Sequence, residues 1–382
     1  MGRGIAQIAS QAGCEVVLVD ASVEALESSE VHLQSIMHRL VEKGRISQAE
    51  ADQVQFRIKR SGNLEELQAC DMVIEAIVED LDTKADLFSA LENVMREDAV
   101  LATNTSSLSV TALASRCQHP KRVIGLHFFN PAPLMALVEV VPALQTDSQI
   151  VSAAMDEMES WGKAPALTKD TPGFIVNRVA RPFYSEAIRI LDEGLADATD
   201  IDASMRAHGF RMGPFELMDL IGHDVNYAVT STVHAAFYGD SRYRPSHTQR
   251  QLVAANWLGR KSGRGFYEYE SGVRKGASGR VIDGVAERIL AMLMNEAADA
   301  IFWQIASATA IDLAMQKGGN YPKGLLEWAD EWGLDRVVGK LDELRSRYGE
   351  ERYRVSPVLR DLSEKGLTFF DSSSMAPATN EG

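Results

Sequence analysis

Short apolar runs alternate with amphipathic stretches over the first 170 residues of the chain. The runs have the length and composition of buried strands, and the stretches between them place apolar residues at helical spacing. The predicted strands lie at 15–19, 72–77, 100–102, 123–127 and 137–141, and the predicted helices lie at 5–12 and 23–43 and begin near 83 and 109. This alternation is typical of an α/β domain with an open, largely parallel sheet.

A different pattern begins at Pro172-Gly173, a turn signal that we interpret as the end of the α/β domain at about residue 170. The sequence pattern after this turn predicts helices only. We divide this part into a helical domain over 171–275 and a second one over 280–370. The stretch 271–279 contains three glycines and reads as a linker. The polar tail 371–382 is predicted to be disordered.

The two helical domains repeat one another at an offset of 110 to 111 residues. The matching pairs are Glu186/Glu296, Ala187/Ala297, Ile201/Ile311, Asp202/Asp312, Met205/Met315, Gly213/Gly324, Glu216/Glu327, Asp219/Asp330, Gly222/Gly333, Asp224/Asp335, Tyr238/Tyr348, Gly239/Gly349, Arg242/Arg352, Tyr243/Tyr353 and Arg244/Arg354. So many coincidences at one offset indicate an internal duplication. The second copy has Glu287 where the first has Asn177, a polar residue on an otherwise apolar helix surface. We therefore expect a structural role for the second copy, covering a face of the first as a partner subunit would.

The N-terminus reads as the second half of a dinucleotide-binding unit. A helix follows Gly2, a strand follows the helix, and Asp20 ends the strand 18 residues after Gly2. An acid there would bind ribose hydroxyls and favour NAD over NADP; the alternative is that Asp20 only caps the next helix. No strand or glycine-rich turn precedes Gly2, which would be the third glycine of the motif. We therefore expect the first strand to be missing and NAD binding to be weakened.

The pair His127 and Glu139 is the strongest candidate for chemistry. His127 ends one predicted strand, and Glu139 lies in the next among Leu137 to Val141. A carboxylate in such surroundings is costly to bury without a partner. A nearby imidazole would supply one, and the carboxylate would orient the ring so that its other nitrogen could take a substrate proton. The alternative is a satisfied core histidine beside an edge-strand glutamate.

Composition narrows the class of protein. The chain has 382 residues with 45% hydrophobic and 24% charged residues, which is ordinary for a globular protein. Its formal net charge of −15 argues against nucleic acid as a partner. No apolar run approaches the roughly 18 residues of a membrane helix, so no membrane partner is predicted. The three cysteines are widely separated, which predicts buried thiols in a reducing cytoplasm and no metal site.

These motifs together resemble the NAD-dependent 3-hydroxyacyl-CoA dehydrogenases of fatty-acid and aromatic-acid breakdown. The matching stretches are 104–108, 125–131, 137–141, 170–178, 213–217 and 259–267. The duplicated helical part, with its Arg181-Pro182-Phe183 sequence, is most similar to 3-hydroxyadipyl-CoA dehydrogenases of phenylacetate degradation, and next to 3-hydroxybutyryl-CoA dehydrogenases. The resemblance implies a Rossmann-type NAD-binding domain, an acyl-CoA substrate, and either a monomer with an internal pseudo-dimer or a homodimer.

The family's functional residues are carried over to matching positions only. The resemblance implies His127 as the general base, Glu139 as its orienting partner, Ser106 and Asn177 as contacts of the substrate oxygen, Asn130 beside the thioester and nicotinamide, Gly2, Asp20, Glu79, Lys84 and Lys261 as cofactor contacts, and Lys43 and Arg39 as candidates for the CoA phosphates. For Ser106 and its neighbour Ser107, capping of the helix that begins near Ser109 is an alternative role.

Two other classes of protein stay open at this point. The β-hydroxyacid dehydrogenases also join a Rossmann domain to a helical one, but they use a catalytic lysine motif that this chain lacks. A truncated paralogue could also persist as a non-enzymatic structural protein, and the missing phosphate-binding turn is the one feature that favours this. The acyl-chain preference is left undecided by the sequence.

Overall fold

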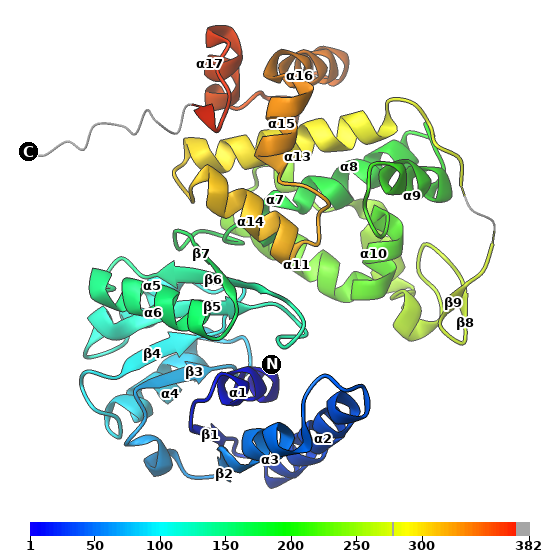
Figure 1. Ribbon diagram of the computed structural model, residues 1–382. Coiled ribbons are helices and arrows are strands. Elements are labelled where there is room, and N and C mark those ends of the chain that lie inside the picture. The colour runs from blue at the N-terminus through cyan, green and yellow to red at the C-terminus, as the bar shows by residue number, and fades with distance from the viewer. Residues whose placement is uncertain (277–278, 372–382) are drawn as a thin grey trace, which may run out of the picture. The chain divides into compact units, whose positions relative to one another are not determined.

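The computed structural model describes residues 1–276 and 279–371, and the chain forms two compact units (Figure 1). The first unit runs from Met1 to Thr171 and the second begins at Pro172. The tail predicted to be disordered lies, beyond Asp371, outside the described residues.

The first unit alternates helices and strands in the order expected of an α/β domain. Its elements are α1 (Gly2–Gln11), β1 (Val16–Val19), α2 (Val23–Glu42), α3 (Gln48–Phe56), β2 (Ile58–Ser61), β3 (Met72–Glu75), α4 (Leu81–Glu92), β4 (Val100–Thr103), α5 (Val110–Ala114), β5 (Val123–Phe128), β6 (Leu137–Pro142), α6 (Ser148–Ser160) and β7 (Ala164–Leu167). Among the described residues of this unit, two short 3-10 helices lie in the connections, Leu64–Leu67 before β3 and Pro120–Arg122 before β5.

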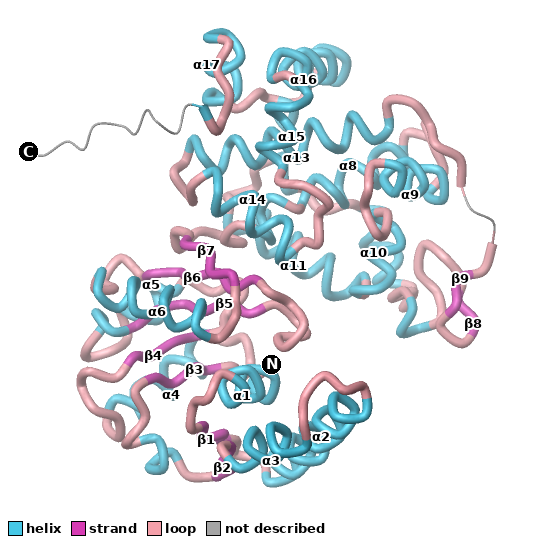
Figure 2. Tube along the Cα trace, viewed as in Figure 1, coloured by secondary structure: helices cyan, strands magenta, loops and turns pink. Residues whose placement is uncertain are grey.

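The strands form two separate sheets, which Figure 2 shows in magenta. β1 pairs with β2 in parallel, and the larger sheet has the order β3-β4-β5-β6-β7. Within it β3, β4 and β5 are parallel, β6 is antiparallel to β5, and β7 is parallel to β6. Among the described residues, no strand pairs with the second edge of β1 or of β3. The carboxyl ends of β3, β4 and β5 therefore share one edge, where ligands bind in open α/β sheets.

The two faces of the larger sheet are covered differently. Ile124, Leu126 and Phe128 of β5 pack in one cluster with α1 and α6. Side chains alternate between the two faces along a strand, so a side chain at position 125 would lie on the opposite face. A Cβ on Gly125 would stand 2.9 Å from side-chain atoms of both Val110 in α5 and Val141 in β6. This close packing requires glycine and fixes which face of β5 meets α5.

The predicted elements of this unit are present with small shifts, and others were missed. The α3 helix, strand β2, helix α6 and strand β7 were not predicted. The suggested caps of the helix near 109 were wrong: Ser109 itself caps α5, and its hydroxyl accepts a hydrogen bond from the Ala112 N–H. Asp20 does not cap α2 either, because Ser22 holds that position and accepts from the Ala25 N–H.

The second unit is almost entirely helical. Its helices are α7 (Val176–Val179), α8 (Arg181–Asp192), α9 (Ala198–Ala207), α10 (Pro214–Ile221), α11 (His223–Ala236), α12 (His247–Ala254), α13 (Val285–Phe302), α14 (Ala308–Gly318), α15 (Leu325–Trp332), α16 (Leu334–Tyr348) and α17 (Pro357–Lys365). The prediction of helices alone was wrong at one place, because β8 (Tyr269–Glu270) and β9 (Val273–Arg274) form a hairpin. The end of the predicted linker is also held in place: a Cβ on Gly279 would overlap the Thr199 carbonyl oxygen, 2.0 Å away.

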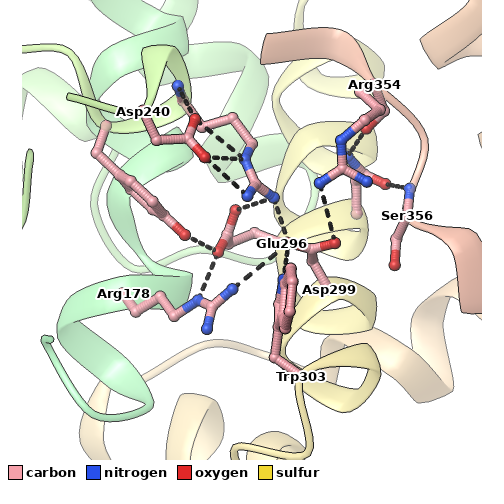
Figure 3. A network of polar contacts seen from close by, with 10 residues as sticks. Arg178, Asp240, Glu296, Asp299, Trp303, Arg354 and Ser356 are labelled. Carbon is pink, nitrogen blue, oxygen red and sulfur yellow. Dashed lines mark hydrogen bonds and ion pairs between the residues drawn. The ribbon is translucent and has the colours of Figure 1, made fainter. Parts of the chain in front are cut away.

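Buried charges tie α13 to the first half of this unit (Figure 3). Glu296 accepts from the Arg178 Nε at 2.8 Å and also from the Tyr243 hydroxyl. One turn along α13, Asp299 accepts from Arg242. Each carboxylate is at most 3% exposed, so these pairs neutralise charges that water cannot reach.

The same arrangement recurs with the two halves of the second unit, 171–275 and 280–370, exchanged. Glu186 on α8 accepts from the Arg288 Nε at 2.6 Å and from the Tyr353 hydroxyl at 2.8 Å. The capping contacts recur too, since Asp202 accepts from the N–H groups of residues 215 and 216, and Asp312 from those of 326 and 327. Each half of the unit therefore supplies a buried glutamate to an arginine and a tyrosine of the other.

Glu296→Ala should destabilise the protein strongly because it leaves Arg178 and Arg242 buried without a full set of counter-charges. We expect the free energy of unfolding to fall by about 3–5 kcal/mol, the usual cost of breaking a buried ion pair. Urea titration followed by tryptophan fluorescence measures this loss, since Trp303 donates to Asp299 in the same network at 3.2 Å.

The control is Glu331→Ala, which breaks an exposed pair with Lys323 and should lower the free energy of unfolding by less than about 1 kcal/mol. Equal losses in the two variants would contradict the assigned role of the network.

Candidate active site

His127 and Glu139 are brought together by the register of β5 and β6. The two residues are direct partners in the antiparallel pairing, so their side chains lie side by side on one face of the sheet. His127 Nδ1 is 2.7 Å from Glu139 Oε2. The histidine side chain is 8% exposed and the glutamate side chain is 0% exposed. The pair predicted from the sequence is therefore present, buried and hydrogen-bonded.

This geometry suits proton transfer at the other ring nitrogen. When His127 Nδ1–H donates to the carboxylate, the ring tautomer is fixed and Nε2 can accept a proton. The carboxylate then stabilises the imidazolium that forms, while burial keeps competing water away from the pair. The ring of Phe129 lies 4.5 Å from the imidazole ring and limits its movement from another side.

Asn104, at the end of β4, holds the strand that carries His127. Its side-chain oxygen accepts from the Phe128 N–H at 2.8 Å, which joins the ends of β4 and β5. Asn104 was recognised from the sequence only as part of a motif, and this role was not predicted. Asn130, two residues after Phe128, is exposed at the same strand end.

Glu79 organises the loop that contains Ser106. Its Oε1 atom accepts from the N–H groups of Ser106 at 2.9 Å and Ser107 at 3.1 Å, and from the Thr105 hydroxyl at 2.7 Å. The Ser106 hydroxyl lies 3.4 Å from the same oxygen. Burial by itself raises the pKa of Glu79, but the hydrogen bonds from Thr105 and Ser106 and the charge of Lys84 outweigh it and lower the pKa. Glu79 is thus an anionic anchor of the serine loop.

Lys84 is buried instead of being open to a ligand. Its side chain is 1% exposed, and Nζ lies 2.7 Å from Glu75 and 3.3 Å from Glu79. Glu75 also accepts from the Thr103 hydroxyl at 2.7 Å. A role for Glu75 was not predicted, although Glu75 carries the same signal as Glu139, a carboxylate within an apolar strand.

The N-terminal residues predicted to meet the cofactor lie at the start of α1 and the end of β1. Asp20 is exposed, and its Oδ1 atom accepts from the Ser22 N–H at 2.9 Å. Gly2 opens α1, but a Cβ there would meet only Ala76, at the ordinary distance of 3.9 Å. The close approach is at Gly4, where a Cβ would stand 3.2 Å from Pro133. The close packing of α1 therefore occurs at Gly4, two residues after Gly2.

The remaining predicted residues are distributed over both units. Arg39 and Lys43 are exposed at the C-terminal end of α2. In the second unit, Lys261 pairs with Asp224 at 2.7 Å. Asn177 is half-buried on α7, and no residue in the described part of the chain donates to or accepts from its amide.

Among the described residues, no group of three or more histidine, cysteine or carboxylate side chains is placed to hold a metal ion. None of the described helices has the length and apolar character needed to span a membrane.

Comparisons with known proteins define the family. Residues 1–171 match the family model for the 3-hydroxyacyl-CoA dehydrogenase NAD-binding domain. Two segments, 173–269 and 285–368, match the model for the 3-hydroxyacyl-CoA dehydrogenase C-terminal domain. The chain is 36% identical to a 3-hydroxyadipyl-CoA dehydrogenase of Escherichia coli K12, over 96% of both proteins. It is 41% identical to a probable 3-hydroxybutyryl-CoA dehydrogenase of Deinococcus radiodurans, which matches 70% of this chain and 96% of that protein.

A solved structure gives the same result. The crystal structure of a 3-hydroxybutyryl-CoA dehydrogenase from Escherichia coli K12 matches with a TM-score of 0.92 and 36% identity, over 96% of both chains. The chain therefore belongs to the 3-hydroxyacyl-CoA dehydrogenase family. It is an NAD-dependent oxidoreductase with a Rossmann-like domain followed by a helical part, as the sequence motifs predicted.

Glu79→Ala should loosen the Ser106 loop. The N–H groups of Ser106 and Ser107 would lose their charged acceptor, which is worth roughly 1.5–3 kcal/mol for a hydrogen bond of this kind. We expect the hydrogen-exchange protection factors of these amides to fall about 10-fold or more. Glu66→Ala, which removes an exposed partner of Lys59, is the control and should leave them unchanged.

The pKa of Glu79 gives the same prediction a pH dependence. Because folding lowers this pKa below the ordinary value of 4.5, the carboxylate stabilises the loop fully above about pH 4.5. The protection should be lost as the pH falls further, through the lowered pKa of the folded protein. Protection that is the same at pH 3 and pH 7, or unchanged by Glu79→Ala, would show that Glu79 does not hold the loop.

Proposed function

We propose that this protein oxidises the C3 hydroxyl of an (S)-3-hydroxyacyl-CoA to a ketone with the His127–Glu139 pair as its acid–base machinery. The observation that carries the proposal is the buried contact of 2.7 Å between His127 Nδ1 and Glu139 Oε2. A secondary alcohol loses its proton reluctantly in water, so a positioned base is the main requirement of the reaction. The pair meets this requirement at the ligand-binding edge of the sheet.

The oxidation removes a hydride and a proton from one carbon–oxygen unit. His127 Nε2 accepts the hydroxyl proton, the hydride departs from C3, and the C3 oxygen becomes a ketone oxygen. NAD, when bound, supplies the nicotinamide ring that accepts this hydride. Ser106 and Asn177 are assigned as hydrogen-bonding groups for the C3 oxygen, where they stabilise the charge that develops during the reaction. In the reverse direction His127 returns the proton to the alkoxide.

The residues present fit a dinucleotide without a 2′-phosphate. The exposed carboxylate of Asp20 is at the carboxyl end of β1, and one of its oxygens has no partner among the described residues. Such an acid accepts hydrogen bonds from ribose hydroxyls and repels a phosphate. We assign Gly2, Glu79, Asn130 and Lys261 to the cofactor contacts as well. We assign Lys84 an indirect role, in which its ion pair with Glu79 holds that carboxylate in position.

We infer that the second unit arose by duplication and that its second copy is structural. Two observations support this: both segments match the same domain model, and the buried Glu186 and Glu296 networks correspond with the halves exchanged. The second copy has Glu287 at the position of Asn177, which removes the group that would contact the substrate oxygen. It would cover the face that a partner subunit covers in a symmetric dimer.

The substrate that we favour is 3-hydroxyadipyl-CoA, with 3-hydroxybutyryl-CoA as the alternative. Both names occur among relatives that match 96% of this chain, a 3-hydroxyadipyl-CoA dehydrogenase and a structure named for 3-hydroxybutyryl-CoA, so the experiments below compare the two substrate types directly. Phenylacetate or fatty-acid degradation is the corresponding metabolic setting. The exposed cations Arg39 and Lys43 are the candidates for contacts with the CoA phosphates.

His127→Gln and Glu139→Gln should each lower turnover by about 100-fold or more, the usual contribution of general acid–base catalysis. Glutamine preserves the size of each side chain but cannot exchange the proton or carry the orienting charge. The measurement is NADH oxidation with 3-oxoadipyl-CoA and with acetoacetyl-CoA as substrates.

His119→Gln is the matched control, because His119 is exposed and its side chain takes no part in the pair. It should retain the turnover of the unmodified protein. Wild-type turnover in either dyad variant would remove the pair from the mechanism. An unmodified protein that is inactive on both substrates would refute the proposed reaction for this chain and favour the structural alternative.

A further inference from the structure

Arg181, the first residue of α8, is a buried cation that has no anionic partner among the described residues. The described part of the chain contains six buried arginines, and five of them have a carboxylate oxygen within 4.0 Å. These pairs are Arg122–Glu92, Arg178–Glu296, Arg242–Asp299, Arg288–Glu186 and Arg352–Glu186. Arg181 is only 5% exposed and is the exception among the described residues. Arginine is almost never buried without a paired charge.

Within the described part of the chain, Arg181 contacts neutral groups. Its Nη1 atom donates to the Thr230 hydroxyl at 3.1 Å, and its guanidinium carbon lies 5.0 Å from the centre of the Tyr184 ring. The Nε–H group is buried and has no hydrogen-bond partner among the described residues. Burial also lowers the pKa of Arg181, with only Tyr184 and Tyr321 acting against it. A buried N–H donor left unsatisfied costs free energy unless a ligand completes it.

A second unsatisfied donor lies in the same cluster. Tyr321 packs against Phe183, two residues after Arg181, with ring centroids 5.7 Å apart. Its hydroxyl is buried and has no hydrogen-bond partner in the described residues. The Nε–H of Arg181 and the hydroxyl of Tyr321 each lack an acceptor among the described residues, and a carboxylate can accept hydrogen bonds from both.

Arg181 also lies one helical turn from Asn177. The backbone between them is helical throughout, with Ala180 at φ −76° and ψ −9° in the right-handed region. Side chains four residues apart share one face of a helix, with Cβ atoms about 5–6 Å apart. In a six-carbon dicarboxylic acyl group, C3 and the terminal carboxyl carbon are joined by three carbon–carbon bonds of about 1.5 Å each. A ligand with its C3 oxygen at Asn177 therefore has the length to bring its far carboxylate to Arg181.

We propose that Arg181 binds the terminal carboxylate of a dicarboxylic 3-hydroxyacyl-CoA and so determines substrate choice. The proposal rests on the function proposed above, because Asn177 locates the C3 end of the acyl group. The carboxylate accepts from the guanidinium Nε–H of Arg181 and from the Tyr321 hydroxyl, which supplies the missing counter-charge. A 3-hydroxybutyryl group ends in a methyl one bond beyond C3 and leaves the cation unpaired. The protein should therefore discriminate against 3-hydroxybutyryl-CoA, because this substrate leaves the charge of Arg181 unpaired.

The test compares two six-carbon substrates that differ only at the far end, 3-oxoadipyl-CoA and 3-oxohexanoyl-CoA. The measured quantity is the ratio of their kcat/KM values in NADH oxidation, which does not depend on the fraction of active protein. The unmodified protein should favour the dicarboxylic substrate. Arg181→Gln should lower the ratio by about 30-fold or more, the loss expected when one partner of a buried charge pair is removed. Arg181→Lys keeps the charge without the planar fork and should lower it less.

Arg189→Gln is the matched control, because Arg189 lies two turns further along α8 and pairs with Glu350 at 2.7 Å. Its ratio should equal that of the unmodified protein. An equal loss on both substrates in Arg181→Gln would assign Arg181 a structural role and overturn the proposal. So would an unmodified protein with no preference for the dicarboxylic substrate.

Binding separates this inference from the proposed reaction. Calorimetric titration with adipyl-CoA and hexanoyl-CoA, which carry no C3 oxygen to reduce, should show tighter binding of adipyl-CoA to the unmodified protein and loss of that difference in Arg181→Gln. If turnover is absent but this difference is present, the carboxylate site stands and the proposed reaction fails. If the two ligands bind equally well to both proteins, the carboxylate site is refuted whatever the turnover.

Discussion

The antiparallel pairing of β5 with β6 is the constraint on which the proposed chemistry depends. It places His127 directly opposite Glu139, and a slip of one residue would send one of the two side chains to the other face of the sheet. The register is held by packing on both faces. Leu126 and Phe128 belong to the cluster with α1 and α6, while Gly125 leaves room for Val110 and Val141. The hydrophobic core thus fixes the position of a polar pair that it would otherwise exclude.

Paired charge is equally important in the second unit. Glu296 and Glu186 each neutralise an arginine contributed by the other half, so the two halves are held by reciprocal contacts in addition to apolar packing. Removing one partner leaves a charge that water cannot reach. Against this background the lack of a carboxylate at Arg181 is informative, because every other buried arginine of the described residues has one. A buried arginine without a carboxylate partner among the described residues is suited to bind an anionic ligand.

The sequence predicted the parts of the site that follow from local pattern. Glu139 stands out because a carboxylate interrupts an apolar strand, and the partner it requires is His127. The same reasoning applies to Glu75 and would have identified its contact with Lys84, but that lysine was assigned to the cofactor by resemblance alone. The hydrogen bond from Phe128 to Asn104 depends on which strands are neighbours, and no local pattern gives that. Strands β2 and β7 were missed since each is short and carries residues unusual in strands, such as Lys59 and Pro165.

The central claim is that His127 and Glu139 act as one unit, and a double-mutant cycle tests it most directly. NADH oxidation with 3-oxoadipyl-CoA would be measured for His127→Gln, Glu139→Gln and the double variant. If Glu139 acts only through His127, the double variant should be no slower than the His127→Gln variant alone, because effects of residues that act together are not additive. If the two losses multiply, the residues act independently and the account of the dyad is wrong.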